Sequence, residues 1–463
     1  MRQITFILLF AFASHFVKAA MTLHIAAVPQ LTPLWDTLYA AGNFNNWEEN
    51  DPDFMFIPDG SGWSVTISGS ENMALEFKIT RGSWSSVEGD ALGNYIGNRT
   101  AVLSNNTTLS ISVAGWEDLS GNSTITNNVR ILDSNFLIPQ LNRQRKIWLR
   151  LPEGYQENGD GYPVVYVMDG QNTMDLATSF SGEWEIDEAL ESFESEACRN
   201  AIVVAIDNGG SLRIDEYSPW VNSQYNEGGE GDAFATFLAE TLKPAIDEHF
   251  NTLPAAEQTT IVGSSLGALM ATYAMCKYPN AFGNGGMFSP AYWFNTEIFG
   301  YAINHPLPAS ARVYFVSGTN ESNDMVNDMQ DMQNTLINVD SANPETLLLT
   351  HTDGAHSEWY WRREFPAAYA WLTQCSSTST ADIAQPIVRV FPNPFVDSLT
   401  IMPISNEAMD VKIIDVRGRE CLVKRIKGEN RLDLSSLSEG LYTLVLTATT
   451  GEIIHQENII KNE

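Results

Sequence analysis

The sequence predicts a multidomain fold in which two small β-sandwiches flank a larger α/β domain with a mostly parallel sheet and helices on both faces. Three observations lead to this prediction. The chain has 463 residues, too many for one ordinary hydrophobic core. Both ends alternate apolar and polar residues between turn residues, which is the period of half-buried strands. The middle alternates continuous apolar strands with stretches of helical length, which is typical of a parallel sheet covered by helices.

The N-terminal stretch MRQITFILLFAFASHFVKAA predicts a secretory signal peptide over residues 1–19. It has a positive start, an apolar run too short to span a bilayer comfortably, and a small-residue cleavage site. No other run is apolar enough to cross a membrane, so we expect no transmembrane segment in the mature protein.

Residues 22–120 hold the alternating runs WSVTISG, LEFKITRG and TLSISVAGW, and they predict the first β-sandwich. Residues 125–375 form the predicted α/β domain, with the strands YPVVYVMDG, NAIVVAIDN, TTIVGSS and ARVYFVSG. Small polar residues make 376–386 a linker, and residues 387–463 return to short strands as a second sandwich.

The chain is strongly acidic, with a formal charge of −31 from 57 acidic and 26 basic residues. A protein that binds a phosphate backbone needs a basic face, so we expect no nucleic-acid partner. The four cysteines are scattered without metal-like spacing, and we predict neither a metal site nor a cofactor.

The segment TTIVGSSLGALMATYAM, residues 259–275, predicts a strand, a tight turn and a helix. Ser265 lies at the centre of G-S-S-L-G, the pattern of a nucleophile held on a strained turn. Glycines on both sides let the strand and the helix approach closely, and the N–H of Leu266 faces a developing oxyanion. The pattern is short enough to arise by chance, so its neighbours must support it.

Two later strand ends supply the partners that such a serine needs. ARVYFVSGTNES, residues 311–322, leads into a loop with two acids, Glu321 and Asp324. LTHTDGAHSEWYW, residues 349–361, places His356 between a strand and a helix, where a general base can reach the serine. The order serine, acid, histidine is the one associated with this sheet topology. His351 lies within the strand, and we interpret it as structural.

Two further segments border the predicted site. The strand YPVVYVMDGQN ends in a turn whose backbone N–H groups can hold an oxyanion, and we include its Asp169 as a candidate substrate contact. The irregular segment 212–232 adds Arg213, Tyr217 and Trp220 as candidate substrate contacts. A structural Arg213–Glu216 pair is an equal alternative for the arginine.

Residues 130–373 resemble the esterase family of α/β hydrolases, which includes esterase D, enterochelin-type esterases, feruloyl esterases and mycolyltransferases. The matching stretches are VYVMDGQN, GEWEID, GGEGDAFATFL, GSSLG, FSPAYW, SGTNES and GAHSEWYW. The resemblance implies an α/β-hydrolase fold with Ser265 as nucleophile, His356 as base and Glu321 as acid, Asp324 remaining the alternative acid. It also implies an oxyanion hole made by the backbone amides of Gln171 and Leu266.

The two flanking domains carry resemblances of their own. GNFNNW, GSGWSVTI and EFKITRGSW are similar to starch- and glycogen-binding modules, which implies a sugar site at Trp47, Lys78, Trp84 and Asn98. VRVFPNPFVDSLTIM, VKIIDVRGREC and LDLSSLSEGLYTLVLTA resemble the C-terminal sorting domain of the type IX secretion system of Bacteroidetes. That resemblance implies the Sec and type IX machineries as partners, and a secreted or surface-attached protein.

These features together predict a secreted serine esterase that acts through an acyl-enzyme on feruloyl- or acetyl-type esters of polysaccharides. Three alternatives stay open: acyl transfer to a sugar, cleavage of a siderophore ester, and glycan binding by an inactive hydrolase scaffold. The residues do not distinguish the acyl group, the alcohol or the oligomeric state.

Overall fold

The computed structural model describes residues 18–119, 123–193, 200–322, 324–337, 343–374, 388–391, 395–403, 408–415, 419–428, 430–448 and 453–461. The chain divides into two compact units, one that ends at residue 374 and one that comprises the tail. The predicted linker and residues 1–17 of the predicted signal peptide lie outside the described residues. Lys18 and Ala19, the last two residues of that predicted peptide, open the first strand.

The N-terminal domain is built from short strands. These are β1 (Lys18–Ala27), β2 (Tyr39–Gly42), β3 (Ile57–Pro58), β4 (Trp63–Ser70), β5 (Ala74–Thr80), β6 (Glu88–Gly89), β7 (Arg99–Val102), β8 (Thr107–Ser112) and β9 (Gly115–Trp116). They form sheets of order β3-β4-β1-β8 and β2-β5-β7, and a pair β6-β9. Alternate residues of β1, such as Leu23 and Ile25, share one hydrophobic core with Phe77 and Ile79 of β5. The first strand thus begins before residue 22.

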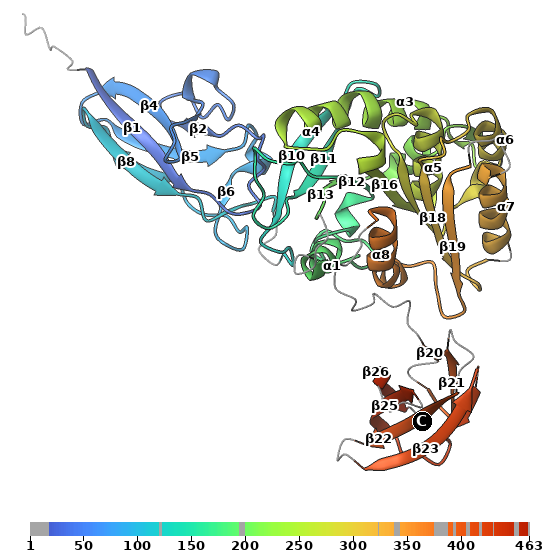
Figure 1. Cartoon of the computed structure of the whole chain (residues 1–463). Helices are drawn as coiled ribbons and strands as arrows, with labels where there is room; N and C mark the ends of the chain where they lie inside the picture. Colours follow the sequence, from blue (N-terminus) through green and yellow to red (C-terminus); the bar gives the residue numbers. More distant parts are fainter. Residues whose placement is uncertain are drawn as a thin grey trace, which may run out of the picture. The chain divides into compact units, whose positions relative to one another are not determined.

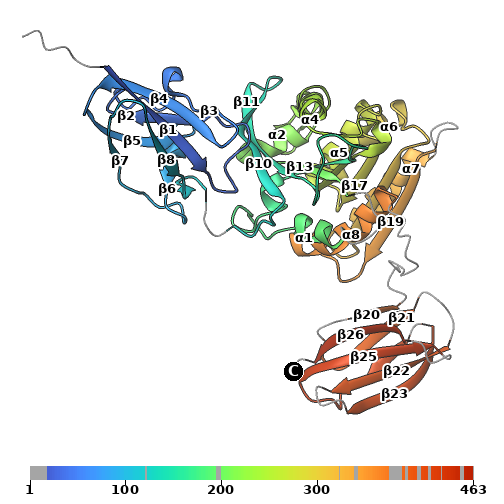
Figure 2. The same cartoon turned by 60° about the vertical axis from the view of Figure 1, so that its left-hand side comes forward.

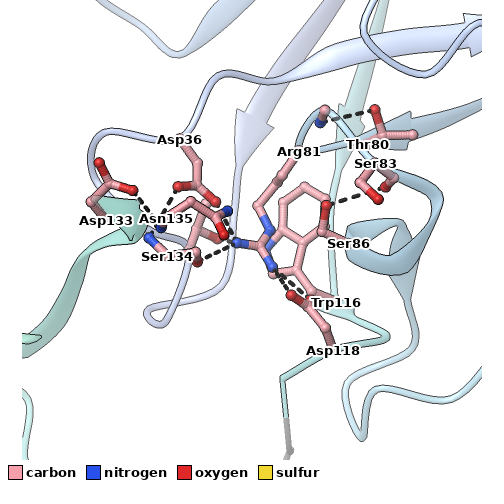
Figure 3. Close-up of polar contacts among 12 residues, drawn as sticks. Asp36, Thr80, Arg81, Ser83, Ser86, Trp116, Asp118, Asp133, Ser134 and Asn135 are labelled. Carbon is pink, nitrogen blue, oxygen red and sulfur yellow. Dashed lines mark hydrogen bonds and ion pairs between the residues drawn. The ribbon is translucent and has the colours of Figure 1, made fainter. Parts of the chain in front are cut away.

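Arg81, just after β5, joins this domain to the central α/β domain (Figure 3). Its guanidinium is fully buried and pairs with Asp36 and Asp118, each at 2.5 Å. It also donates to Ser134 Oγ at 3.1 Å and lies 5.0 Å from the ring centre of Trp116. Ser134 belongs to β10 (Val129–Ile138) of the central sheet, so one buried cation connects segments from both domains.

The central sheet has eight strands. They are β10 (Val129–Ile138), β11 (Arg143–Arg150), β12 (Val164–Met168), β13 (Ile202–Ile206), β16 (Thr259–Ser264), β17 (Asn284–Phe288), β18 (Arg312–Gly318) and β19 (Glu345–His351). Their order is β10-β11-β13-β12-β16-β17-β18-β19. The pairs β10–β11 and β11–β13 are antiparallel, and the pairs from β13 to β19 are parallel. The sheet is therefore mixed, with the predicted parallel arrangement over most of its width.

Helices cover this sheet on both faces, as the alternating pattern predicts (Figures 1 and 2). The helices are α1 (Ile186–Phe193), α2 (Arg213–Tyr217), α3 (Gly231–Phe237), α4 (Lys243–His249), α5 (Leu266–Lys277), α6 (Glu297–Asn304), α7 (Met325–Ile337) and α8 (Glu358–Leu372). α1 and α8 pack together on one side, and α3 to α5 lie on the other (Figure 1). α5 is buried along almost its whole length, because the sheet lies on one side of it and other helices on the other.

The tail unit contains β20 (Val388–Phe391), β21 (Ser398–Pro403), β22 (Ala408–Asp415), β23 (Glu420–Lys427), β24 (Asn430–Asp433), β25 (Gly440–Ala448) and β26 (Ile453–Lys461). Its sheets have the orders β20-β21-β24 and β23-β22-β25-β26. Val411, Ile413, Leu444 and Leu446 contribute to its separate hydrophobic core. In the part of the chain that the structure describes, no helix has the length and apolar character needed to cross a membrane.

Candidate active site

Ser265 occupies the sharp turn between β16 and α5. Its backbone has φ 56° and ψ −122°, a conformation that L-residues rarely adopt and that costs free energy. Surrounding hydrogen bonds hold it there: its N–H donates to the carbonyl of Phe288, and its carbonyl accepts from the N–H of Ala291. The strained turn places Ser265 immediately before α5, at the positive end of the helix dipole.

The glycines beside Ser265 are required by close packing. A Cβ at Gly263 would lie 2.4 Å from the backbone of Gly267, so the strand and the helix could not meet at this distance with a side chain there. A Cβ at Gly267 would lie 3.1 Å from Met168 at the end of β12. The two glycines of the G-S-S-L-G motif therefore allow the close packing around the turn.

His356 and Glu321 form a hydrogen-bonded pair. His356 Nδ1 lies 2.9 Å from Glu321 Oε2, and the carboxylate is only 1% exposed while the imidazole is 40% exposed. Glu321 Oε1 also accepts hydrogen bonds from Ser289 Oγ at 2.9 Å and from the Gly318 N–H at 2.6 Å. These donors hold the carboxylate so that it can orient the imidazole.

Asp324, the alternative acid, lies on the surface just before α7, where its carbonyl accepts from the Asp328 N–H. His351 is hydrogen-bonded to the Tyr360 hydroxyl at 2.9 Å within the domain. No hydrogen bond joins Ser265 Oγ to His356 in the described residues, and in enzymes without substrate this contact is often long.

Sequence reasoning missed two residues that support this pair. Ser289 follows β17 at φ 45° and is fully buried against Glu321. The indole N–H of Trp361 in turn donates to Ser289 Oγ at 3.0 Å. The position of Ser289 directly after a buried strand, in line with the ends of its parallel neighbours, was the available signal.

The second strained turn follows β12. Asp169 has φ 58°, and Gly170 begins a short 3-10 helix, η3 (Gly170–Asn172). A Cβ at Gly170 would lie 2.8 Å from the backbone of β13, which explains the glycine. Gln171 in η3 and Leu266 at the start of α5 both lie in first helical turns, where N–H groups have no acceptor within the helix. These are the two amides predicted for the oxyanion hole.

Asp169 is buried beside this turn and is fully engaged by neighbours. Arg213 binds it through two hydrogen bonds of 2.6 and 2.8 Å, and Asn208 Nδ2 donates to it at 2.7 Å. Tyr217 is fully buried, and its hydroxyl accepts from the Asp169 N–H at 3.1 Å. The alternative Arg213–Glu216 pair is wrong, because Glu216 instead binds Arg145 at 2.6 Å.

Trp220, the other candidate contact in this loop, packs edge-on against the rings of Tyr273 and Tyr301. Glu358, at the start of α8, accepts from Asn172 Nδ2 at 3.3 Å. Burial raises the pKa of Glu358, with Asp169 raising it further, while His356 and Arg213 lower it. The charges of Asp169, His356 and Arg213 therefore all influence Glu358.

The N-terminal domain contains a hollow of about 410 Å³ that gathers all four predicted sugar-binding residues. It is lined by Trp47, Lys78, Trp84, Val87, Tyr95, Asn98 and Glu117. The rings of Trp47 and Trp84 lie 6.2 Å apart, and Lys78 Nζ lies 4.8 Å from the centre of the Tyr95 ring. Tyr95 and Glu117 were not predicted; the 74% exposure of Tyr95 marks a surface aromatic that a sequence pattern does not reveal.

The fold and these turns define an α/β-hydrolase-like enzyme, and comparison with known proteins gives its family. A family model described as "Putative esterase" matches residues 138–372, just over half of the chain. The chain belongs to this esterase family and is an esterase. A second family model, "Secretion system C-terminal sorting domain", matches residues 389–462, and it points to secretion or cell-surface attachment. The resemblances to the esterase family and to the type IX sorting domain are confirmed. The resemblance of the N-terminal domain to starch- and glycogen-binding modules stays a prediction.

Individual proteins that are similar to this chain share only a minority of its residues. The uncharacterized protein YbbA of Bacillus subtilis is 26% identical over 241 residues, covering 49% of this chain and 92% of that protein. An alpha-amylase of Niallia circulans is 34% identical over 94 residues, covering 20% of this chain and only 7% of the amylase. Among solved structures, an enterobactin esterase of Shigella flexneri has 15% identity and a TM-score of 0.43, covering 77% of this chain and 93% of its own. A ferulic acid esterase has 14% identity and a TM-score of 0.42, covering 53% and 98%.

Proposed function

We propose that the chain is a serine esterase in which Ser265, His356 and Glu321 form the catalytic triad. The hydrogen bond of 2.9 Å between Glu321 and His356, at the same sheet edge as the strained Ser265 turn, carries the proposal. Asp324 is exposed on the surface and makes no such bond with His356 among the described residues, which favours Glu321 as the acid.

The reaction proceeds in two steps. Ser265 Oγ attacks the ester carbonyl while its proton passes to His356 Nε2, and the backbone N–H groups of Gln171 and Leu266 stabilise the oxyanion. His356 then protonates the departing alcohol, leaving an acyl-enzyme. A water molecule, deprotonated by His356, attacks this ester, and Ser265 recovers its proton as the acid leaves.

The other groups near the site act by positioning. The Asp169–Arg213 pair and the Tyr217 hydroxyl brace the turn that carries Gln171, so we assign Asp169, Arg213 and Tyr217 to support of the oxyanion hole. Trp220 remains a candidate substrate contact at the edge of its aromatic cluster.

The accompanying N-terminal domain supports the proposed substrate class. The exposed rings of Trp84 and Tyr95, beside a lysine and an asparagine, suit the faces and hydroxyls of sugar rings. Short matches to an alpha-amylase and an amylopullulanase, covering 7% and 6% of those proteins, are in keeping with an α-glucan ligand. We therefore assign the enzyme to feruloyl- or acetyl-type esters on polysaccharides outside the cell.

Hydrolysis of a p-nitrophenyl acyl series and of methyl ferulate by the purified full chain tests this function. The Ser265→Ala variant should lose at least about 10³-fold in turnover, because only binding and the oxyanion hole remain. Ser264→Ala is the matched control and should keep its activity, since Ser264 ends β16 and is buried. Equal turnover by wild type and Ser265→Ala would refute the nucleophile. An acylated sugar formed in the presence of a sugar acceptor would instead identify a transferase.

A further inference from the structure

Three carboxylates outside the triad lie close together at the start of α1. Glu183, Asp187 and Glu188, here called the acidic cluster, each offer an oxygen, and these oxygens lie within 4.8 Å of one another. Asp187 is fully buried and Glu183 is 5% exposed. Buried like charges repel strongly and are retained only where something compensates them.

Hydrogen bonds from the described residues compensate these negative charges only in part. Each carboxylate has one buried oxygen without a hydrogen-bond partner: Glu183 Oε1, Asp187 Oδ1 and Glu188 Oε2. The remaining oxygens of Glu183 and Asp187 accept from Thr124 Oγ1 at 3.0 Å and from the Thr126 N–H at 2.8 Å. The guanidinium of Arg362 does not supply the missing charge, because it pairs with Glu185.

We propose that the acidic cluster binds a calcium ion. All three ligand groups are carboxylates, the hard oxygen donors that calcium prefers, and the cluster offers none of the imidazole or thiolate ligands typical of zinc. Two oxygens on opposite sides of a calcium ion lie about 5 Å apart, so oxygens that lie within 4.8 Å of one another can bind the same ion. Thr126 Oγ1, also buried without a partner, is a candidate neutral ligand.

Protonation of the acidic cluster competes with the binding of an ion. A proton shared between Asp187 and Glu188 is the competing means of compensation, and the experiment below separates the two.

The position of the site indicates a structural role for the ion. The cluster and Asp175 hold the segment 123–126 that leads into β10, with Ser123 Oγ donating to Asp175 Oδ2 at 2.8 Å. Trp184, between the cluster residues, packs against Trp361, the donor to Ser289 beneath Glu321. A bound ion would thus fix both the connection from the N-terminal domain and the packing behind the triad. The sequence predicted no metal site because its four cysteines lack metal-like spacing.

Thermal unfolding of the purified full chain in EDTA and in increasing calcium tests the site. We expect the Tm of the wild type to rise with calcium and to saturate with a Kd of roughly 10⁻⁴ to 10⁻³ M, the range of extracellular calcium modules. Asp187→Asn and Glu188→Gln should each weaken this effect at least tenfold. Glu191→Gln, which removes an exposed acid from the same helix, should behave as the wild type. Terbium emission excited through tryptophan should appear in the wild type and be lost in Asp187→Asn.

Three results would overturn the proposal. No calcium-dependent shift in the wild type, with a higher Tm for Asp187→Asn in EDTA, would identify a shared proton. An equal calcium shift in the wild type and in both variants would place the ion elsewhere. A larger shift with magnesium than with calcium would refute the assignment to calcium.

Discussion

The region of the proposed triad and the N-terminal hollow are built in opposite ways. Around Ser265 the backbone is forced into rare conformations, and the acid is only 1% exposed and held by two donors besides His356. Around the hollow the candidate sugar contacts include exposed rings, 40% for Trp84 and 74% for Tyr95. Catalysis in the first region would depend on a few individual atoms. Sugar binding in the second would depend on the surface area of several rings. Single substitutions should therefore differ greatly in effect between them.

Glu321→Gln gives the largest effect expected from a residue other than the nucleophile. An amide in place of the carboxylate cannot stabilise the imidazolium and favours the wrong tautomer, so kcat should fall about 10⁴-fold. Steady-state hydrolysis of a p-nitrophenyl ester measures it. Asp324→Asn is the matched control and should retain activity within about twofold, because its side chain is exposed. A dead Asp324→Asn beside an active Glu321→Gln would reverse the assignment of the acid.

Arg81→Met should lower the thermal stability and leave ester hydrolysis unchanged, which is a smaller effect than that of Glu321→Gln. The variant leaves Asp36 and Asp118 without their buried partner, and breaking such a pair costs about 3 kcal/mol or more. The Tm of the first unit should therefore fall by several degrees. Turnover of a soluble ester at low temperature should stay unchanged, since Arg81 lies outside the triad.

Arg419→Met removes an arginine that is 79% exposed in the tail and serves as the control for calorimetry of Arg81→Met. Equal Tm values for the wild type and Arg81→Met would show that the junction does not stabilise the first unit.

The sequence predicted best those features that local patterns determine. The strand–turn–helix around Ser265 was predictable because glycines, a serine and a helical apolar run occur within a few residues. The strand β17 was not, since its sequence NGGMF has weak strand propensity. The glycine at 285 instead reflects packing against a helix: a Cβ at Gly285 would lie 2.3 Å from Met275 Sδ on α5. Contacts of this kind depend on the assembled fold.

The same reasoning explains which site residues were missed. Ser289 and Trp361 act through a chain of hydrogen bonds that joins segments 72 residues apart, and no local pattern encodes it. Arg213 was placed in the right region, yet its partner is Asp169, 44 residues away, and not the neighbouring Glu216. The sequence shows which residues are charged. Which of them form an ion pair depends on tertiary packing.

Trp47→Ala combined with Trp84→Ala gives the smallest effect on catalysis and tests the hollow directly. Each ring that covers a sugar face contributes through buried apolar area, about 1.5 kcal/mol or more, so the double variant should bind an insoluble α-glucan roughly 100-fold more weakly. Pull-down on the glucan measures this, and hydrolysis of a soluble ester should be unchanged. Trp293→Ala removes a tryptophan that is 51% exposed on the catalytic domain and should bind as the wild type. Full binding by the double variant would refute a sugar site in the hollow while leaving the triad untouched, because the two regions share no residue.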